Sequence, residues 1–218
     1  MTLFDIFPES SFRKTIGRPI SIIRRDRTKL GEIAQTKPGC MAEMGGGAWD
    51  RYVRTNPKCN SQALAEFFKR NDPKIYLAME RHTGIRVLSD IAYTVAEIED
   101  DQLEEKCAAE VLLAVIYPNV LRISDVTFRN PYQEIPEEKR IYRFQHFKGL
   151  GLFTEFLVNC ESYCREHAIH EITLCAAYID LVPFFEKHEF RVDDTPAGKI
   201  AVGAKMGIPM TKALRNAA

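Results

Sequence analysis

The hydrophobic pattern separates an interrupted first part of the chain from a regular second part. Before residue 50, prolines at positions 8, 19 and 38 and the run Gly45-Gly46-Gly47 interrupt every long periodic segment. Only residues 20–23, rich in isoleucine, predict a short strand there. We expect an irregular segment over residues 1–50, with the glycines as a flexible connection, and one main domain over residues 51–218.

Three stretches between residues 60 and 118 predict helices. Residues 61–71 begin with Ser61 as an N-cap, and residues 74–81 continue the helical period. Residues 101–116 carry an apolar stripe at helical spacing, and acidic side chains crowd the first turns, where the helix dipole favours them. Pro118 then ends this helix.

After residue 118 the pattern changes between strand and helix. Alternating, β-branched residues predict the first strand of this part, and two prolines predict the loop that follows it. We expect strands at residues 120–128, 139–147 and 171–177, helices at 152–167 and 181–188, a loop at 130–138, and a final hairpin that Gly198 and Gly203 interrupt and that ends at 210–214. This order predicts an α/β chain in the broad sense, with α+β character.

Charge is balanced overall but unevenly distributed. Thirty basic and thirty acidic residues give a formal net charge of zero, which predicts neither a nucleic-acid nor a membrane partner. Residues 13–29 hold seven basic residues and one acidic residue, whereas residues 97–110 hold seven acidic residues and one basic residue. Such runs are typical of solvated faces, and they also allow pairing within the fold or between the subunits of a homodimer.

The six cysteines indicate free thiols rather than disulfides or a metal site. They stand at positions 40, 59, 107, 160, 164 and 175, with no C-x-x-C pair among them. Residues 1–12 lack the basic start and long apolar run of a secretory signal, and no apolar stretch approaches the roughly 20 residues of a membrane span. We therefore expect a cytoplasmic protein without a metal, in which Cys175 is a core residue of its strand.

One junction in the second part has the features of an anion site. The predicted strand ending at Phe147 runs into Lys148-Gly149-Leu150-Gly151, and a long amphipathic helix follows. The first N–H groups of a helix lack internal partners and lie at the positive end of its dipole. Glycines let the backbone approach a phosphate closely, so such a turn can hold a pyrophosphate.

The elements around this turn resemble the GNAT superfamily of acyl-coenzyme A N-acyltransferases. Members carry Q/R-x-x-G-x-G/A at the strand–helix junction, a short helix with a Y-E-K-x-G-F-like ending, and a last strand ending in M-x-K-x-L. This chain has H-F-K-G-L-G from His146, F-E-K-H-E-F from Phe185 and M-T-K-A-L from Met210, in the same order and spacing. The resemblance is clearest over residues 120–214 and implies a mixed, mostly antiparallel sheet of six or seven strands with helices on both faces.

The same resemblance implies a site for acetyl-coenzyme A as cosubstrate. The pyrophosphate would rest on the backbone amides of the turn, and the pantetheine arm would pair with the preceding strand. A separation of two strands at Phe144 and Leu174 would admit that arm, with the acyl carbonyl near Gln145. The cofactor-binding residues implied in this way are Phe144, Gln145, His146, Phe147, Lys148, Gly149, Leu150, Gly151 and Leu152.

The chain departs from the family pattern at three positions. His146 replaces the usual Gln or Arg, and Glu189 replaces the usual Gly. Phe185 stands where many members have a Tyr that protonates the leaving thiolate, and Phe has no proton to donate. Tyr178, at the end of the preceding predicted strand, is therefore the candidate acid.

The reaction also needs a base that takes a proton from the attacking ammonium group. The resemblance places it near the start of the strand before the glycine turn, where Glu134, Glu137 and Glu138 stand. The pattern alone does not select among them, and we take Glu137 as the candidate.

The function implied is transfer of an acetyl or other acyl group from coenzyme A to a primary amine of a small molecule or a protein. One alternative is a catalytically inactive GNAT-fold interaction module, because Phe185 is no acid. Another is an acetyltransferase recruited to a protein or nucleic acid by the basic N-terminal segment.

Overall fold

The protein folds around one mixed sheet with the strand order β1-β2-β3-β4-β6-β8-β7, and β5 pairs separately with β4. The computed structural model describes residues 1–55, 80–81, 84, 86–142 and 145–214. The strands are β1 Ile20–Asp26, β2 Leu88–Ile98, β3 Cys107–Ile116, β4 Val120–Glu134, β5 Phe147–Gly149, β6 Glu171–Tyr178, β7 Arg191–Val192 and β8 Met206–Ala213. The helices are α1 Glu9–Ile16, α2 Leu30–Thr36, α3 Pro38–Thr55, α6 Phe153–Glu166, α7 Val182–Glu186 and α8 Pro196–Ala204, with 3-10 turns η1 Leu3–Ile6, η2 Arg27–Lys29, η3 Glu137–Lys139 and η4 Ile179–Leu181.

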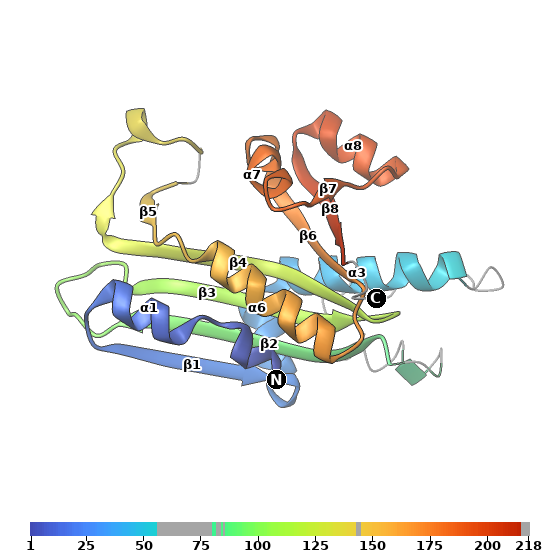
Figure 1. Cartoon of the computed structure of the whole chain (residues 1–218), viewed down its shortest axis with the longest axis horizontal. Helices are drawn as coiled ribbons and strands as arrows, with labels where there is room; N and C mark the ends of the chain where they lie inside the picture. The colour runs from blue at the N-terminus through green and yellow to red at the C-terminus, as the bar shows by residue number, and fades with distance from the viewer. Residues whose placement is uncertain (56–79, 82–83, 85, 143–144, 215–218) are drawn as a thin grey trace.

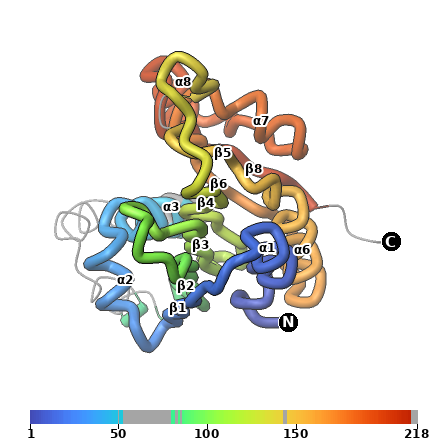
Figure 2. The backbone as a smooth tube through the Cα atoms, turned by 90° about the vertical axis from the view of Figure 1, so that its left-hand side faces the viewer, coloured from blue at the N-terminus to red at the C-terminus, as the bar shows by residue number. Residues whose placement is uncertain are grey.

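Helices cover both faces of this sheet, as expected for the fold class (Figures 1 and 2). η1, α1 and α6 lie on one face, and α2 and α3 lie on the other. The described residues contain eight strands, with the short β5 and β7 included, which is slightly above the expected six or seven. Every neighbouring pair is antiparallel except β4 with β6, which is parallel.

The larger core lies under α6. Its buried side chains Phe156, Leu157, Cys160, Tyr163 and Cys164 recur at the spacing of one helix face, so this face packs on the sheet. Residues of η1, α1 and α7 complete the same cluster. The predicted helix at 152–167 and the predicted strands at 120–128 and 171–177 are thereby confirmed.

The second core lies between the sheet and the pair α2 and α3. Met41, Met44, Ala48 and Trp49 of α3 pack with Ile33 of α2 against β2 and β3. The run Gly45-Gly46-Gly47 is part of α3, so the prediction of a flexible connection is wrong. Glycine costs helix stability, but packing of the apolar residues on either side outweighs that cost.

The first fifty residues are ordered, which corrects the expected irregular segment. They form η1, α1, β1, α2 and most of α3, and β1 pairs with β2 along its whole length. The expected boundary at residue 50 falls inside α3. The short strand expected at residues 20–23 is confirmed as part of β1.

Residues 101–116 form a turn followed by β3, so the helix predicted there is wrong. From Ala108 to Ile116, nearly every side chain is buried, because α6 covers one face of the sheet and α2 and α3 cover the other. The sequence of a strand that is buried on both faces is a continuous apolar run. Such a run also contains apolar residues at helical spacing, so the pattern does not distinguish the strand from a helix. The acidic residues belong to the β2–β3 connection rather than to a first helical turn.

Two further predictions need correction. The loop expected at 130–138 begins later, because β4 continues to Glu134, and the strand expected at 139–147 is reduced to β5. Ile141, expected in that strand, is 75% exposed. The expected final hairpin contains α8 between β7 and β8, so Gly198 and Gly203 lie in a helix instead of interrupting strands.

The helix expected at 61–71 lies outside the described residues. Of the helix expected at 74–81, the structure describes only Glu80 and Arg81, and both are helical. The short helix expected at 181–188 is present as α7.

Two glycines of α8 give a matched test of packing. A Cβ on Gly198 would lie 2.1 Å from the carbonyl oxygen of Asp193, whereas a Cβ on Gly203 would meet nothing within 4 Å. We expect Gly198→Ala to lower the free energy of unfolding by about 1–3 kcal/mol. Gly203→Ala should leave it unchanged or raise it by up to about 1 kcal/mol, because alanine favours the helix. Urea unfolding measures both, and equal effects would contradict this packing.

Candidate functional site

Two parallel strands, β4 and β6, separate in the middle of the sheet (Figure 1). Their pairing consists of Leu121 with Ile172, Arg122 with Thr173, and Ile123 with Leu174. Beyond the last pair β6 leaves the plane of β1–β4 together with β8. The glycine turn and α6 lie between the two separated strands in the chain. The opening begins at Ile123 and Leu174, and Phe144, which was expected opposite Leu174, lies outside the described residues.

A β-bulge lies at the point where the strands separate. Leu113 of β3 pairs with Ile123, and the adjacent Leu112 pairs with Asp125, so Ser124 is an extra residue of β4. Bulges bend a strand and increase its twist, which favours separation from β6. The Ser124 hydroxyl is buried without a hydrogen-bond partner among the described residues.

Beyond the bulge, the edge of β4 that faces β6 is unpaired over residues 124–127. β3 pairs with the opposite edge of these residues, and no strand in the described part of the chain pairs with the edge that faces β6. At its far end, the N–H of Leu150 donates to the carbonyl oxygen of Phe128 at 3.1 Å, which attaches the glycine turn to β4. The edge between Ser124 and Phe128 is about 13 Å long at the usual rise of a strand.

The glycine turn lies against β4 and opens α6. β5 pairs Gly149 with Arg129, and Gly151 adopts a φ of 71°, a left-handed conformation that favours glycine. The N-cap of α6 is Leu152, which offers no side-chain acceptor to the first amides of the helix. Amides at an uncapped helix N-terminus can bind an anion.

The structure gathers most of the implied cofactor-binding residues at this turn. Phe147, Lys148, Gly149, Leu150, Gly151 and Leu152 form β5 and the entry to α6. The carbonyl of His146 accepts the Ile135 N–H at 2.8 Å, and Gln145 accepts the Ile141 N–H at 2.9 Å through its side chain. These bonds hold Gln145 and His146 within the connection from β4 to β5. Phe144 lies outside the described residues.

An aromatic cluster joins the first turn of α6 to α7. The ring of Phe153 lies 5.1 Å from Phe184, 5.7 Å from Phe185 and 5.0 Å from His188, measured between centroids. Phe185, at the position where the resemblance implied an acid, is 7% exposed and also packs on Phe190. Its aromatic contacts explain why this position is apolar here.

A polar cluster that the sequence did not indicate lies on the α3 face of the separated strands. Lys37, at the start of α3, pairs at 2.7 Å with both Glu110 of β3 and Asp125 of the bulge. Tyr93 of β2 donates its hydroxyl to Glu110. Burial opposes the charge of Lys37, but the two carboxylates outweigh it, and the pKa of Lys37 is raised. These residues are far apart in sequence, and only the spacing of the fold brings them together.

A second part of this polar cluster centres on Arg122, which is 9% exposed. Its Nη2 forms an ion pair with Glu43 of α3 and also donates to Cys175 Sγ at 3.1 Å. Its Nε has no hydrogen-bond partner in the part of the chain that the structure describes. Cys175 is half-buried, so the expectation of a core cysteine is wrong.

The candidate acid and base lie on different elements. Tyr178 is the last residue of β6, beyond the separation from β4, and is half-buried. Glu137 is exposed in η3, within the connection from β4 to β5. Glu43, Asp125 and Glu110 are the carboxylates that the structure places in the polar cluster on the α3 face. The roles of Tyr178 and Glu137 stay predictions.

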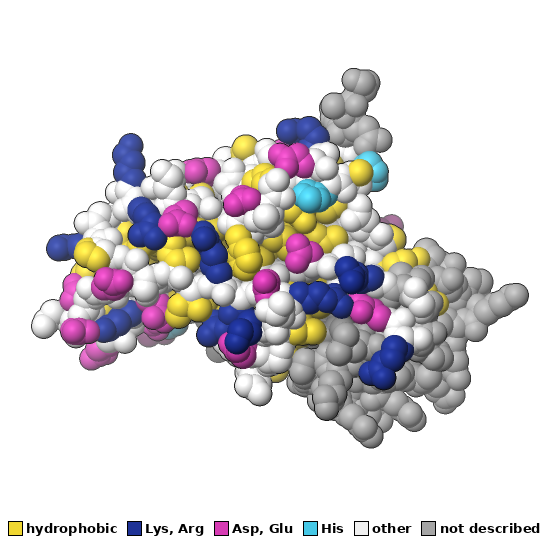
Figure 3. All heavy atoms as spheres, turned by 90° about the horizontal axis from the view of Figure 1, so that it is seen from below, with side chains coloured by type: hydrophobic (Ala, Val, Ile, Leu, Met, Phe, Trp, Pro, Cys, Tyr) yellow, Lys and Arg dark blue, Asp and Glu magenta, His cyan; other side chains and the backbone are white. Residues whose placement is uncertain are grey.

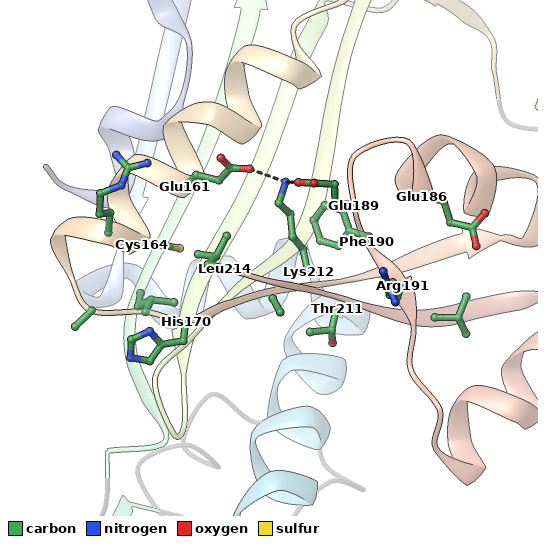
Figure 4. Close-up of a pocket in the computed structure, with 15 residues that line it drawn as sticks. Glu161, Cys164, His170, Glu186, Glu189, Phe190, Arg191, Thr211, Lys212 and Leu214 are labelled. Atoms are coloured by element: carbon green, nitrogen blue, oxygen red, sulfur yellow. Dashed lines mark hydrogen bonds and ion pairs between the residues drawn. The ribbon is translucent and has the colours of Figure 1, made fainter. Parts of the chain in front are cut away.

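An open groove of about 1510 Å³ lies elsewhere, between the second half of α6 and the strands β7 and β8 (Figure 4). Lys212 of β8 projects beneath α6 and pairs with Glu161 at 2.7 Å and with Glu189 at 2.9 Å. Glu189 has a φ of 68°, which explains the family's glycine at this position, and its carboxylate is held by Lys212. The residues that line this groove belong to neither β4 nor the glycine turn.

Local ion pairs neutralise much of the basic run at 13–29. Arg13, Arg24, Arg25, Arg27 and Lys29 pair with Glu9, Glu32 or Glu80. On the face drawn in Figure 3, basic and acidic side chains are interspersed. None of these pairs joins the basic run to the acidic run at 97–110.

No helix in the described residues is long and apolar enough to cross a membrane. Within the same residues, no three His, Cys, Asp or Glu side chains come together as metal ligands. The described cysteines are all free.

Comparison with known proteins gives only distant structural similarity. No family model matches the sequence. No curated protein matches it. A chain described as an N-acetyltransferase from Lactobacillus plantarum aligns at 12% identity and a TM-score of 0.37, over 91% of this chain and 100% of that chain.

Two further solved structures align at a similar level. An acetyltransferase of the GNAT family from Staphylococcus aureus has 13% identity and a TM-score of 0.37, over 90% of this chain and 100% of that chain. A chain described as a streptothricin acetyltransferase from Bacillus anthracis, in complex with acetyl coenzyme A, has 15% identity and a TM-score of 0.36, over 57% and 63%. Identities and TM-scores this low carry no argument about activity.

The lysine at the start of α3 provides a stability test. We expect Lys37→Met to lower the free energy of unfolding by about 2–4 kcal/mol, because Glu110 and Asp125 would lose the cation that both share. Lys29→Met is the matched control, since its pair with Glu32 is exposed to solvent and should contribute little to stability. Chemical denaturation measures both, and a loss at Lys37 no larger than at Lys29 would contradict a structural role for the cluster.

The aromatic cluster predicts a pH effect through His188. Burial, and then the charge of Lys212, lower the pKa of His188 in the folded protein. The unfolded chain therefore binds a proton at higher pH, near the usual pKa of about 6.5. The free energy of unfolding should therefore be highest above about pH 6.5 and should decrease as the pH falls from there through the lower pKa of His188 in the folded protein. Thermal unfolding between about pH 7.5 and 5.5 measures this, and His188→Phe should flatten the dependence.

Proposed function

We propose that this protein is an acyltransferase that moves an acetyl or other acyl group from coenzyme A to a primary amine. The observation that carries the proposal is a continuous backbone path along β4. It begins at the bulge of Ser124, follows an unpaired strand edge, and ends at the glycine turn that opens α6. Each part of the path offers the kind of group that one part of coenzyme A requires.

The cofactor fits this path by its own chemistry. An extended arm with amide groups, such as pantetheine, can pair with a free strand edge as an added strand does. The pyrophosphate can then rest on the uncapped amides of α6, beside the positive φ of Gly151. Lys148 is exposed beside the turn and adds a positive charge.

The reacting end of the arm would lie at the bulge. A backbone N–H that a bulge frees from its ladder can polarise a carbonyl oxygen, and Ser124 also has a hydroxyl without a protein partner among the described residues. The acyl carbonyl therefore belongs beside Ser124 in this proposal, rather than beside Gln145. Coenzyme A carries the activated acyl group, and the chain binds and orients it.

The amine acceptor would approach from the α3 face. There Glu43 and Asp125 stand beside the opening between β4 and β6, with Arg122 and Lys37 as their partners. Carboxylates attract an ammonium group and can take its proton, which is the role that the sequence assigned to Glu137. No observation favours a nucleic-acid acceptor, because the basic run is engaged in local ion pairs.

Calorimetric titration with acetyl-coenzyme A tests the proposal directly. We expect binding at micromolar strength, and at least a tenfold loss in Gly151→Asp, which places a carboxylate where the pyrophosphate rests. Gly17→Asp is the matched control, because Gly17 has a similar φ of 63°, also meets nothing within 4 Å, and lies at the end of α1.

If the wild-type protein does not bind acetyl-coenzyme A, the proposal is wrong, and a non-catalytic interaction module becomes the better description. If Gly17→Asp weakens binding as much as Gly151→Asp does, the glycine turn is not the site. Binding without turnover of any amine would also favour the interaction module.

A further inference from the structure

Cys175 lies immediately beyond the last pair of β4 with β6, at the opening itself. In β6, Ile172, Leu174 and Ala176 are buried in the core beneath α6. Because successive side chains of a strand alternate between faces, Cys175 lies on the α3 face. It is half-buried, whereas Cys160 and Cys164 are buried beneath α6.

Arg122 brings this thiol and a carboxylate together. Its Nη2 donates to Cys175 Sγ at 3.1 Å, and the same nitrogen forms the ion pair with Glu43. The Cys175 sulfur and the Glu43 carboxylate therefore both contact Arg122 Nη2 and lie close to each other. The thiol thus has a hydrogen-bond donor and a carboxylate beside it, the kind of neighbours that a nucleophilic cysteine requires.

Two buried polar atoms beside the opening lack a hydrogen-bond partner among the described residues. Arg122 is more than nine-tenths buried, and its Nε has no hydrogen-bond partner among the described residues. The Ser124 hydroxyl, two residues along β4, is also without one there. Buried polar atoms nearly always have a hydrogen-bond partner. Two such atoms without one at the same opening, Arg122 Nε and Ser124 Oγ, therefore indicate a polar ligand such as a carbonyl oxygen.

The other described cysteines are in environments that suppress reactivity. Burial raises the pKa of the thiols of Cys40, Cys107 and Cys160, and it raises the pKa of Cys164 to about 12. These thiols are held in the protonated form at neutral pH. Cys175 receives a hydrogen bond from Arg122 Nη2 at 3.1 Å, directly beyond the last pair of β4 with β6.

We propose that Cys175 receives the acyl group from coenzyme A and holds it as a thioester before the amine takes it. This inference rests on the proposed function, because it requires the acyl carbonyl at the bulge beside Ser124. It replaces direct attack of the amine on coenzyme A by two successive acyl transfers.

The first transfer balances without any further reactant. Glu43 takes the proton of the Cys175 thiol, and the sulfur attacks the acyl carbonyl carbon. A new carbon–sulfur bond forms to Cys175 while the carbon–sulfur bond to coenzyme A breaks. The departing coenzyme A thiolate takes the proton from Glu43. One thioester replaces another, so no oxidant, reductant or energy source is required.

The second transfer regenerates the protein. The neutral amine attacks the thioester carbon of Cys175, and the carbon–sulfur bond breaks as the amide bond forms. Glu43 takes the proton that the nitrogen loses in this step. The Cys175 thiolate takes the proton back from Glu43. Arg122 is a positioning residue in both transfers, because its Nη2 donates to the Cys175 sulfur and also pairs with the Glu43 carboxylate.

Mass spectrometry of the full chain incubated with acetyl-coenzyme A alone, without an amine, tests this inference. After an acid quench, we expect the intact protein to gain the mass of one acetyl group, located on the peptide that contains Cys175. Neutral hydroxylamine should remove it, as it does thioesters. Cys175→Ala should lose the adduct and still bind acetyl-coenzyme A by calorimetry, and Cys175→Ser, which keeps the side-chain shape, should lose the thioester as well.

Cys107→Ala is the matched control, because Cys107 is half-buried in β3 and should leave the adduct intact. Arg122→Met should reduce the amount of adduct at least tenfold while the protein remains folded by circular dichroism. If the protein binds acetyl-coenzyme A but carries no adduct on Cys175, the thioester inference is wrong and the proposed function stands. If it does not bind acetyl-coenzyme A, both fail.

Discussion

The parallel pair of β4 and β6 is the constraint on which the rest of the structure depends. Only three residue pairs join them, and the bulge at Ser124 follows directly. A parallel pair requires a long crossover, which α6 provides, and the crossover brings the glycine turn back against β4. A short pairing with a bent strand thus produces an opening, a free strand edge and a helix N-terminus without a side-chain cap at one place.

Such an opening in a sheet would be unstable without support on both faces. Beneath α6 that support is apolar, because Phe156, Leu157 and Cys160 pack on the strands. On the α3 face it is polar, since Lys37 and Arg122 tie α3 to β3 and β4 through carboxylates. Buried ion pairs are weak evidence of stability, but they fix geometry, which suits the side of the opening where chemistry is proposed.

The departures from the family pattern have structural explanations. Glu189 occupies a left-handed turn that glycine usually fills, and its ion pair with Lys212 offsets part of the strain. Phe185 belongs to the aromatic contacts between α6 and α7. A proton donor at this position is therefore absent for reasons of packing, which directs attention to the thiol and carboxylates on the other face.

The sequence alone determined the local features: the glycine turn before α6, the apolar face of that helix, the buried strand β6 and the order of the last elements. These depend on periodicity and turn chemistry within about twenty residues. Tertiary structure decided the rest. The strand β3 could not be distinguished from a helix, because burial on both faces removes any alternation. The joining of Lys37, Arg122, Glu43 and Cys175 also required the fold, since residues from α3, β4 and β6 become neighbours only when the sheet and its helices pack together.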